Sequence, residues 1–269
     1  MTQVDNQAIE QLIRDIGAYQ LEGHRSLCHA DITVKDDTSH GYSVVTEYDE
    51  ESERRVFEFI DKHFPNDSFL GEEHGNVARD TSRYWVLDPI DGTSNFTQGV
   101  AYWGPSLALI DERGPERGWV YFPVLDEMFH AVRGEGAFLN GQRIQTSGVT
   151  EYTNLCTVGT VSRLHRRERL TCPAKHRILG SIIVNLCYLA TGSFVATHFR
   201  GSIWDLAAGW LIAREAGAVI HCDPALDTLD LASMTPKDSP SIKVFATANE
   251  KLPDFRDFIV PLDEPITGK

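Results

Sequence analysis

The sequence predicts a mixed α/β protein, of the α+β or α/β class, built from two subdomains that pack closely together. Three observations support this: apolar residues recur at helical spacing near the N-terminus, short strands separated by turns follow, and strands alternate with helices in the second half. The 269 residues suffice for one large domain or two modest ones sharing a core. The composition changes near residues 142–155 without a Pro/Ser-rich linker, so we place the subdomains at 1–145 and 146–269.

Two amphipathic helices are predicted before the first strong strand. The first contains an apolar series at helical spacing: Ile9, Leu12, Ile13, Ile16 and Tyr19. The polar composition from Asp31 to Ser43 predicts a loop or a loose hairpin. Thr46 then precedes acidic residues that favour a helix N-terminus, and the apolar residues from Val56 to Phe64 continue as the second helix.

An antiparallel meander is predicted in the middle of the chain. Residues 68–70 read as a short strand, and the apolar and aromatic residues 84–87 as a stronger one. We expect this second strand to stop at Asp88-Pro89, because proline cannot donate to a ladder. Further strands are predicted at 106–110, 118–122 and 127–132. Turn residues rich in Gly, Pro and Asp separate these strands, which favours antiparallel neighbours.

The second half of the chain predicts an α/β layer. Short β-like runs occur at 154–160, 178–179, 194–199, 218–221 and 244–246. Helical stretches lie between them, notably Ser181 to Leu189 and Asp205 to Ala216. Strands that alternate with helices in this way are typical of a layered α/β architecture.

Composition and charge limit the function classes. The formal net charge is −14, and a surface this acidic repels nucleic-acid phosphates and anionic membranes, so we expect neither as a partner. The sequence has no uninterrupted apolar run of about 18 residues and no secretory-type start. Its cysteines are odd in number and never spaced as CxxC, which favours free thiols in a reducing compartment and a cytoplasmic location: Cys28, Cys156, Cys172, Cys187 and Cys222.

The segment from Asp88 to Thr93 has the pattern of a metal and phosphate site. An apolar strand delivers Asp88 to its carboxyl end, where α/β proteins place ligands, and Asp91 follows across a tight turn. Gly92 lets the backbone approach a ligand, and Thr93 with the next serine predicts a helix N-terminus with free N–H groups. Carboxylates facing such N–H groups suit Mg²⁺ with a bridging phosphate. The alternative is an ordinary turn with solvated aspartates.

Three other acidic positions are ambiguous when taken alone. Glu72 follows a short predicted strand, and a loop acid of this kind is often only solvated. Asp205 and Asp49 each fall in the first turn of a predicted helix, where an acid commonly interacts with the helix dipole.

Together these motifs resemble the inositol monophosphatase family, part of the lithium-sensitive, metal-dependent phosphatase superfamily that includes fructose-1,6-bisphosphatase. The resemblance covers nearly the whole chain and rests on four motifs in order: Val45-Thr46-Glu47-Tyr48-Asp49, Gly71-Glu72-Glu73, Asp88-Pro89-Ile90-Asp91-Gly92-Thr93-Ser94-Asn95-Phe96 and Trp204-Asp205-Leu206-Ala207-Ala208-Gly209. It implies a layered αβαβα sandwich of the inositol monophosphatase and fructose-bisphosphatase type, and a homodimer. The N-terminal subdomain would carry most metal ligands, and the C-terminal one would supply Asp205 and the substrate cap.

The resemblance also implies a ligand set for Mg²⁺, with two or three ions per site. Glu72, Asp88 and the carbonyl of Ile90 would hold the first ion. Asp88, Asp91 and Asp205 would hold the second, and a third, weaker ion would lie at Glu72, which we also count as catalytic.

Catalytic roles follow from the same resemblance. The N–H groups of Gly92 and Thr93 would bind the phosphate, and Thr93, oriented by Asp49, would accept the proton of the attacking water. The motif offers no obvious phospho-acceptor, so we predict direct attack by water without a phosphoenzyme. Lys35 is a weaker match to a lysine of the family's metal-site loop.

The substrate-binding positions depart from the family pattern. His198 aligns with an acidic residue that recognises inositol hydroxyls in the inositol-specific members, and Arg200 follows it. These two could bind a second anionic or acceptor group, or His198 could be an ordinary strand residue. Gly180-Ser181 resembles the turn that contacts the substrate ring.

Several functions therefore remain open at this point. The substrate is a small phosphorylated metabolite such as inositol 1-phosphate, with histidinol phosphate, fructose 1,6-bisphosphate and 3′-phosphoadenosine 5′-phosphate as alternatives. A catalytically silent binding or assembly module is an alternative of another class. Against it, a silent protein has no need to keep carboxylates whose mutual repulsion is costly without a metal.

Overall fold

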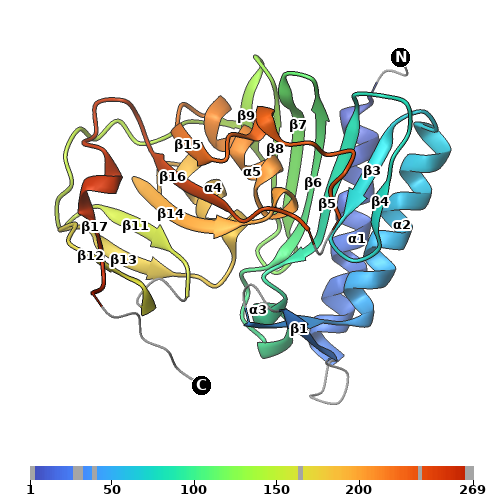
Figure 1. Cartoon of the computed structure of the whole chain (residues 1–269), viewed down its shortest axis with the longest axis horizontal. Coiled ribbons are helices and arrows are strands. Elements are labelled where there is room, and N and C mark those ends of the chain that lie inside the picture. The colour runs from blue at the N-terminus through green and yellow to red at the C-terminus, as the bar shows by residue number, and fades with distance from the viewer. Residues whose placement is uncertain (1–3, 27–32, 38–40, 163–165, 236–237, 264–269) are drawn as a thin grey trace.

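The protein is layered, with helices and sheets alternating from one side of the molecule to the other. Figure 1 shows the computed structural model, which describes residues 4–26, 33–37, 41–162, 166–235 and 238–263. Two N-terminal helices lie at one side, a large sheet beside them, then a second helix pair and a smaller sheet (Figure 1). Of the described helices, none is both long and apolar enough to cross a membrane.

The large sheet has eight strands in the order β10-β9-β8-β7-β6-β5-β3-β4. Their bounds are β3 Ser68–Gly71, β4 Gly75–Val77, β5 Tyr84–Asp91, β6 Gly104–Asp111, β7 Gly114–Phe122, β8 Glu127–Val132, β9 Gly136–Leu139 and β10 Gln142–Ile144. Strands β5 to β10 pair antiparallel in sequence order, which confirms the predicted meander. Only the β3–β5 pair of this sheet is parallel among the described strands, so both strands end at the same edge.

Helices α1 (Asn6–Ser26) and α2 (Glu47–His63) confirm the two predicted N-terminal helices and cover one face of the large sheet. Their apolar residues pack with Trp85 and Trp119 of the sheet. Between the two helices, β1 (Thr33–Asp37) and β2 (Gly41–Val45) form an antiparallel hairpin, one of the two forms predicted for this segment. The short helix α3 (Thr93–Gln98) follows β5.

The strand β5 is longer than predicted. It does not stop at Asp88-Pro89 but runs on to Asp91, where it pairs again with Gly104 of β6. The register shifts between Asp88 and Asp91, because proline lacks the N–H that a regular ladder needs and the chain bulges there. This bulge brings two aspartates of one strand to the same edge of the sheet.

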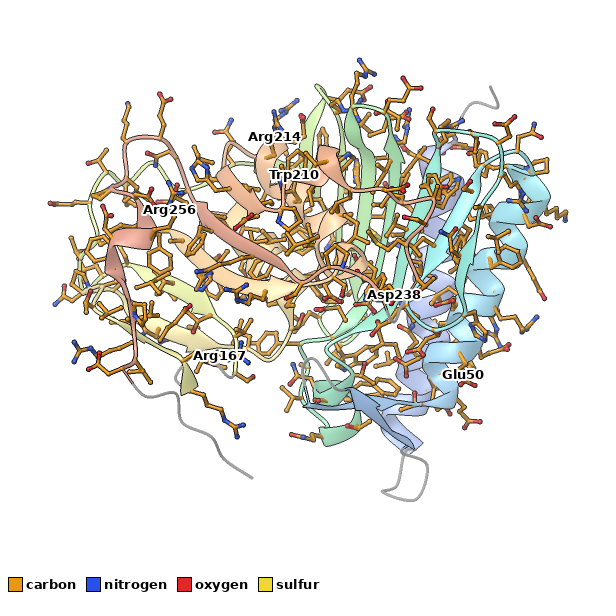
Figure 2. All side chains as sticks on the ribbon, viewed as in Figure 1. Glu50, Arg167, Trp210, Arg214, Asp238 and Arg256 are labelled. Atoms are coloured by element: carbon orange, nitrogen blue, oxygen red, sulfur yellow. The ribbon has the colours of Figure 1, made fainter. Side chains whose placement is uncertain are left out.

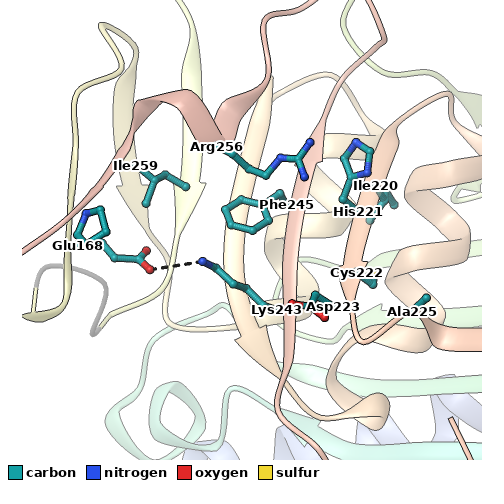
Figure 3. Close-up of a pocket in the computed structure, with 11 residues that line it drawn as sticks. Glu168, Ile220, His221, Cys222, Asp223, Ala225, Lys243, Phe245, Arg256 and Ile259 are labelled. Carbon is teal, nitrogen blue, oxygen red and sulfur yellow. Dashed lines mark ion pairs between the residues drawn. The ribbon is translucent and has the colours of Figure 1, made fainter. Parts of the chain in front are cut away.

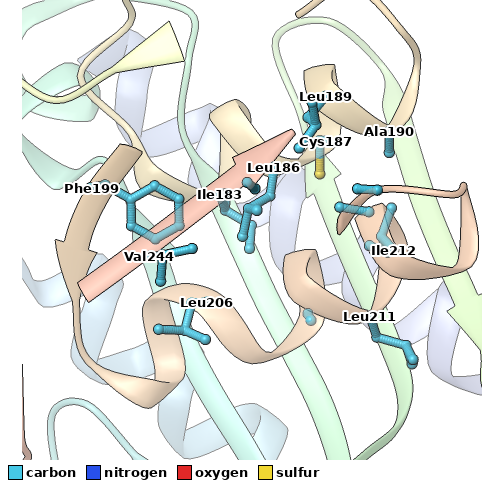
Figure 4. Close-up of a cluster of buried hydrophobic side chains, with 14 of the residues drawn as sticks. Ile183, Leu186, Cys187, Leu189, Ala190, Phe199, Leu206, Leu211, Ile212 and Val244 are labelled. Carbon is cyan, nitrogen blue, oxygen red and sulfur yellow. The ribbon is translucent and has the colours of Figure 1, made fainter. Parts of the chain in front are cut away.

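The C-terminal half confirms the predicted α/β layer. Its sheet has the order β13-β11-β14-β16-β15, with β11 Thr157–Thr160, β13 Lys175–Ile178, β14 Ala196–Gly201, β15 Val219–Asp223 and β16 Ile242–Thr247. Helices α4 (Ile182–Ala190) and α5 (Ile203–Glu215) lie between the two sheets. Their side chains form the central core with Phe199 and Val244 of the small sheet (Figure 4).

The outer face of the small sheet carries short elements that the sequence did not suggest. β12 (Glu168–Leu170) and β17 (Ile259–Pro261) pair antiparallel, and the 3₁₀ helix η4 (Phe255–Phe258) packs on β16. A further 3₁₀ helix, η3, spans Leu226–Thr228. The predicted αβαβα sandwich has a layer of α-helices on this face. Among the described residues, a short β pair and 3₁₀ structure lie there instead.

Candidate metal centre

Three carboxylates converge at the edge where β3 and β5 end and α5 begins. One oxygen atom from each of Glu72, Asp88 and Asp205 lies within 4.8 Å of the others. The N–H of Glu72 donates to the carbonyl of Leu87 at 3.2 Å, which extends the β3–β5 pairing by one residue. Asp205 is the N3 residue of a capping box, and its carboxylate accepts from the N–H of Ser202 at 2.6 Å. Ordinary secondary structure therefore assembles this cluster from three distant segments.

Burial and mutual repulsion both act on these carboxyls. Burial raises the pKa of Glu72 well above its ordinary value, and the charges of Asp205, Glu73 and Asp49 raise it further. Burial likewise raises the pKa of Asp88, and the charges of Glu72, Asp91 and Asp205 raise it further. The pKa of Asp205 rises to about 7 for the same reasons. Without a cation, this volume does not tolerate all three negative charges, and the carboxyls take up protons at a higher pH than usual.

This donor set fits a hard divalent cation. Carboxylate oxygens are the ligands that Mg²⁺ prefers in proteins, and a cation would remove the repulsion that raises these pKa values. The predicted metal ligands Glu72, Asp88 and Asp205 are thus brought together by the fold.

Asp91, the fourth predicted carboxylate, faces the start of α4. Its carboxylate accepts from the hydroxyl of Ser181 and from the N–H groups of Ile182 and Ile183, at 3.3 and 3.1 Å. Burial raises the pKa of Asp91 to about 6, and these hydrogen bonds oppose that rise. A carboxylate has about four lone-pair sites, so these contacts leave acceptor capacity for a cation.

The predicted pair Thr93 and Asp49 also comes together. The Thr93 hydroxyl donates to the carbonyl of Ile90 at 2.9 Å and lies 3.4 Å from a carboxylate oxygen of Asp49. Asp49 is buried, and its other oxygen accepts from the N–H and hydroxyl of Thr46 at 2.8 and 2.6 Å. Burial raises the pKa of Asp49 to about 7. A carboxyl with this pKa can both take up and release a proton near neutrality.

Gly92, rather than Thr93, is the N-cap of α3. Its φ of 88° lies in the left-handed region, and a Cβ there would meet the carbonyl oxygen of Tyr102 at 2.8 Å. Only glycine fits this position without strain. The first N–H groups of α3 have no acceptor within the helix, so they are available beside the carboxylate cluster.

The Gly180-Ser181 turn lies against the same motif. Ser181 caps α4, accepting from the N–H of Val184 at 3.3 Å, and donates to Asp91. Gly180 has a φ of 78°, and a Cβ there would meet the amide of Asn95 at 2.5 Å. The structure therefore brings these two predicted residues to the metal-site motif.

His198 has a different position from the one its alignment implies. Its side chain is buried on the outer face of the small sheet, stacked on Phe245 with ring centroids 4.3 Å apart. One ring nitrogen contacts the carbonyl of Val244 and the other contacts Glu168, each at 2.8 Å. Burial lowers the pKa of His198. Both nitrogens are engaged within the chain, so we leave His198 out of the proposed substrate site.

Two other predicted positions, Arg200 and Lys35, lie on strands. Arg200 is exposed near the end of β14. Lys35 lies on β1 opposite Ser43, and its side chain is outside the described part of the chain.

Glu53 is a residue that the sequence reasoning missed. It is only 1% exposed, and its carboxylate accepts from the N–H groups of Glu73 and His74 at 2.8 and 2.7 Å. A Cβ at Gly71 would meet this carboxylate at 2.3 Å, so glycine is required there. Glu53 therefore fixes the loop that carries Glu72. The sequence offered one indication of this role, because Glu53 is an acid on the apolar face of α2, in helical register with Val56.

Gln20 has a similar role for the other strand end. Its side-chain amide donates to the carbonyl of Pro89 at 2.7 Å and to the hydroxyl of Ser52 at 3.0 Å. Gln20 is fully buried on the apolar face of α1, four residues after Ile16. It ties both N-terminal helices to the bulge of β5.

A hollow of about 620 Å³ lies elsewhere, on the outer face of the small sheet (Figure 3). Phe245, Lys243 and His221 line it from the sheet, with Arg256 from η4 and Glu168 from β12. It contains none of the clustered carboxylates, so we assign it no part in the metal chemistry.

Comparison of the chain with known proteins identifies its family. The model of the inositol monophosphatase family matches residues 2–254. The chain belongs to the inositol monophosphatase family. Members of this family are phosphomonoesterases that use Mg²⁺ and bind phosphorylated metabolites.

The relatives differ in what their names state. The chain is 36% identical over 195 residues to Nus factor SuhB of Pasteurella multocida, covering 66% of this chain and 71% of that one. It is 36% identical over 191 residues to the fructose-1,6-bisphosphatase/inositol-1-monophosphatase of Thermotoga maritima, covering 66% and 70%. The solved structure of a Thermotoga maritima IMPase superposes with a TM-score of 0.72 at 28% identity, over 90% of this chain and 91% of that one. This agreement confirms the predicted fold type.

Proposed function

We propose that this protein is a Mg²⁺-dependent phosphomonoesterase for a small phosphorylated polyol or related metabolite, of the inositol 1-phosphate kind. The observation that carries the proposal is the convergence of Glu72, Asp88 and Asp205 beside the N-terminus of α3. Carboxylates alone would repel a phosphate ester. Carboxylates that hold cations next to free N–H groups would bind it.

The ligand assignment follows the family resemblance. Glu72, Asp88 and the Ile90 carbonyl would hold one Mg²⁺, and Asp88 would also share a second with Asp91 and Asp205. A third ion would contact Glu72. When bound, these ions neutralise the phosphate, lower the pKa of a bound water and stabilise the leaving alkoxide.

The chain's own groups then orient the ester and move protons. The N–H groups of Gly92 and Thr93 would donate to phosphate oxygens at the start of α3. The Thr93 hydroxyl would accept the proton of the attacking water and pass its own proton to Asp49, 3.4 Å away. The pKa of Asp49, raised to about 7 by burial, suits a proton acceptor of this kind.

A panel of phosphate esters with and without Mg²⁺ tests this function directly. We expect turnover that requires Mg²⁺ and is inhibited by Li⁺. The panel should contain inositol 1-phosphate, histidinol phosphate, fructose 1,6-bisphosphate, 3′-phosphoadenosine 5′-phosphate and a generic aryl phosphate. Absence of turnover on every ester, with Mg²⁺ binding intact by calorimetry, would contradict the proposal.

That negative result would favour a binding or assembly module, the second candidate. The observation in its favour is the 36% identity to a relative named as a Nus factor. We also propose a cytoplasmic location, which the four free cysteines among the described residues support. From the family resemblance we further propose a homodimer, which a measurement of the molar mass in solution tests.

A further inference from the structure

The hydroxyl of Ser106 is a buried polar group that the proposed chemistry does not yet use. Ser106 is the third residue of β6 and is only 1% exposed. Its hydroxyl has no hydrogen-bond partner among the described residues. A buried hydroxyl without a partner destabilises a fold, and native proteins seldom keep one that binds no water, ion or ligand. This hydroxyl therefore indicates a bound group close to it.

The register of the large sheet places Ser106 beside Asp88. The two residues are opposite partners in the antiparallel pair of β5 and β6, in the last regular position before the register shifts. Opposite residues of such a pair project on the same face of the sheet, with Cβ atoms about 4.5–5.5 Å apart. A single water molecule can bridge two polar side chains at this separation.

The face that Ser106 and Asp88 share is the one that α5 covers. Val86 and Ala108, the next residues of the two strands on this face, belong to the central core. Helix α5 supplies the third carboxylate of the cluster and packs over β5 and β6. Figure 2 labels Trp210 of this helix, which lies between the two sheets in that view. Ser106 thus faces the layer in which the carboxylates converge.

On its other side, Ser106 has an apolar neighbour. It pairs there with Val120 of β7, which is fully buried in the central core and offers no polar side-chain atom. The polar neighbour of the hydroxyl across the sheet is therefore Asp88, one of the three clustered carboxylates. This asymmetry connects the unpartnered hydroxyl with the metal centre.

We infer that Ser106 is a positioning residue of the metal centre: its hydroxyl oxygen accepts from a water ligand of the cation that Asp88 holds, and its O–H donates to the Asp88 carboxylate. This inference rests on the proposed function and adds to its metal centre a residue that contacts no ion itself. A serine suits the role because a hydroxyl accepts and donates at once, and Mg²⁺ in proteins keeps several water ligands. Groups that orient metal ligands in this way contribute strongly to metal affinity.

Mg²⁺ binding and thermal unfolding of Ser106→Ala test the inference without any ester. Calorimetry should show a Mg²⁺ affinity roughly tenfold weaker than that of the wild type. At a Mg²⁺ concentration about 100 times the wild-type Kd, the Mg²⁺-induced gain in unfolding free energy should fall to about half. The metal-free Tm should stay equal or rise, because the variant no longer buries an unpartnered hydroxyl. A purely structural serine would instead lower the Tm in both states.

Two other buried hydroxyls provide matched controls. Thr197 of β14 is fully buried and its hydroxyl also has no partner among the described residues, but it lies on the small sheet. Thr197→Val should therefore leave the Mg²⁺ affinity unchanged. Ser68 of β3 is fully buried too, and its hydroxyl accepts from the N–H of Arg79 at 2.8 Å. Ser68→Ala should lower the Tm equally with and without Mg²⁺.

The inference is overturned if Ser106→Ala binds Mg²⁺ as tightly as the wild type, or if its Tm falls equally in both states as in Ser68→Ala. A similar loss of Mg²⁺ affinity in Thr197→Val would also overturn it, because the effect would then come from general packing. If the wild type binds Mg²⁺ but hydrolyses no ester, the proposed function fails and the binding data still decide the role of Ser106. If the wild type binds no Mg²⁺, the metal centre and the inference both fail.

Discussion

The N-terminal and C-terminal halves of the molecule differ in how their charges are held. On the N-terminal side, Asp88 accepts from the N–H of Ile90 at 2.9 Å, Asp49 is held by Thr46, and Glu53 is held by the loop after β3. These carboxylates are buried. On the C-terminal side, Arg177 and Arg200 are exposed, with no carboxylate partner among the described residues.

This difference separates the charges that the metal centre requires from those that it does not. Buried, multiply bonded carboxylates keep a fixed geometry, which a metal-assisted hydrolysis requires. Exposed charges contribute little to the folding free energy. We therefore expect changes to the buried carboxylates to lower the turnover of every ester.

The largest effect should come from Asp88→Asn, which removes the carboxylate shared by both proposed ions. We expect kcat to fall by on the order of 10³-fold on every ester, as for loss of a major electrostatic contribution. Steady-state rates at saturating Mg²⁺, with circular dichroism to check the fold, measure this. Near-native activity of a folded variant would remove Asp88 from the chemistry and contradict the importance of the buried carboxylates.

The next effect concerns Glu53→Ala, which tests whether a residue that touches no ligand sets the geometry of Glu72. Two N–H groups would lose their acceptor, at about 1–3 kcal/mol each. The Mg²⁺ concentration for half-maximal activity should rise roughly tenfold or more, as for other groups that orient metal ligands. Glu58→Gln is the matched control, an acid on the same helix with a 61% exposed side chain. An unchanged Mg²⁺ requirement in Glu53→Ala would limit its role to folding.

A third prediction uses thermal unfolding to compare metal-free and Mg²⁺-loaded protein. Burial raises the pKa of Asp49 and Asp205 to about 7 in the metal-free fold. Their protonation therefore stabilises that fold fully below the unfolded-state pKa of about 4, and this stabilisation is lost as pH rises through 7. The metal-free Tm should fall between pH 5 and pH 8.

Mg²⁺ should reverse this trend, because metal binding displaces the same protons. At 100 times its Kd, Mg²⁺ adds about 2.7 kcal/mol, which corresponds to a Tm increase of roughly 5–10 °C, larger at pH 8 than at pH 5. Asp88→Asn is the control and should lose most of the increase. A Mg²⁺-induced shift that is equal at both pH values would show that the carboxylates do not titrate as described.

Residue order alone predicted the part of the site that lies within one continuous segment, and the family resemblance added Glu72, Asp205 and Asp49 from other segments. From Asp88 to Thr93, strand, bulge and helix start follow each other, so residue order alone places two carboxylates beside N–H groups. Glu53 and Gln20 escaped prediction because they bond to backbone groups of segments remote in sequence. Backbone N–H and C=O groups occur at nearly every residue, so the sequence does not show which of them a distant side chain will bond.

His198 shows another limit of prediction from sequence. Its alignment gave the right strand, but the alternation of side chains in β14 sends it to the outer face, while Phe199 faces the core. The β12–β17 pair was missed because it joins two three-residue segments about 90 residues apart, which are too short to show a strand pattern in the sequence.

The smallest effect should come from Ser181→Ala, at a contact between the N-terminal and C-terminal halves. The change removes the N-cap of α4 and the hydroxyl that donates to Asp91. Loss of a cap costs about 1 kcal/mol, so Tm should fall by about 2–4 °C. The pKa of Asp91 should rise further, because the hydrogen bond that lowers it is gone.

Activity measurements on Ser181→Ala then distinguish two roles of this turn. If Ser181 acts mainly on Asp91, the loss in kcat/KM should be a few-fold, equal on all esters of the panel, and reduced by higher Mg²⁺. If the turn instead contacts the substrate, the loss should differ between esters and be independent of Mg²⁺. Ser193→Ala, an exposed serine just beyond the C-terminus of α4, controls for general effects on that helix. A loss confined to some esters would assign the Gly180-Ser181 turn to substrate selection rather than to the metal centre.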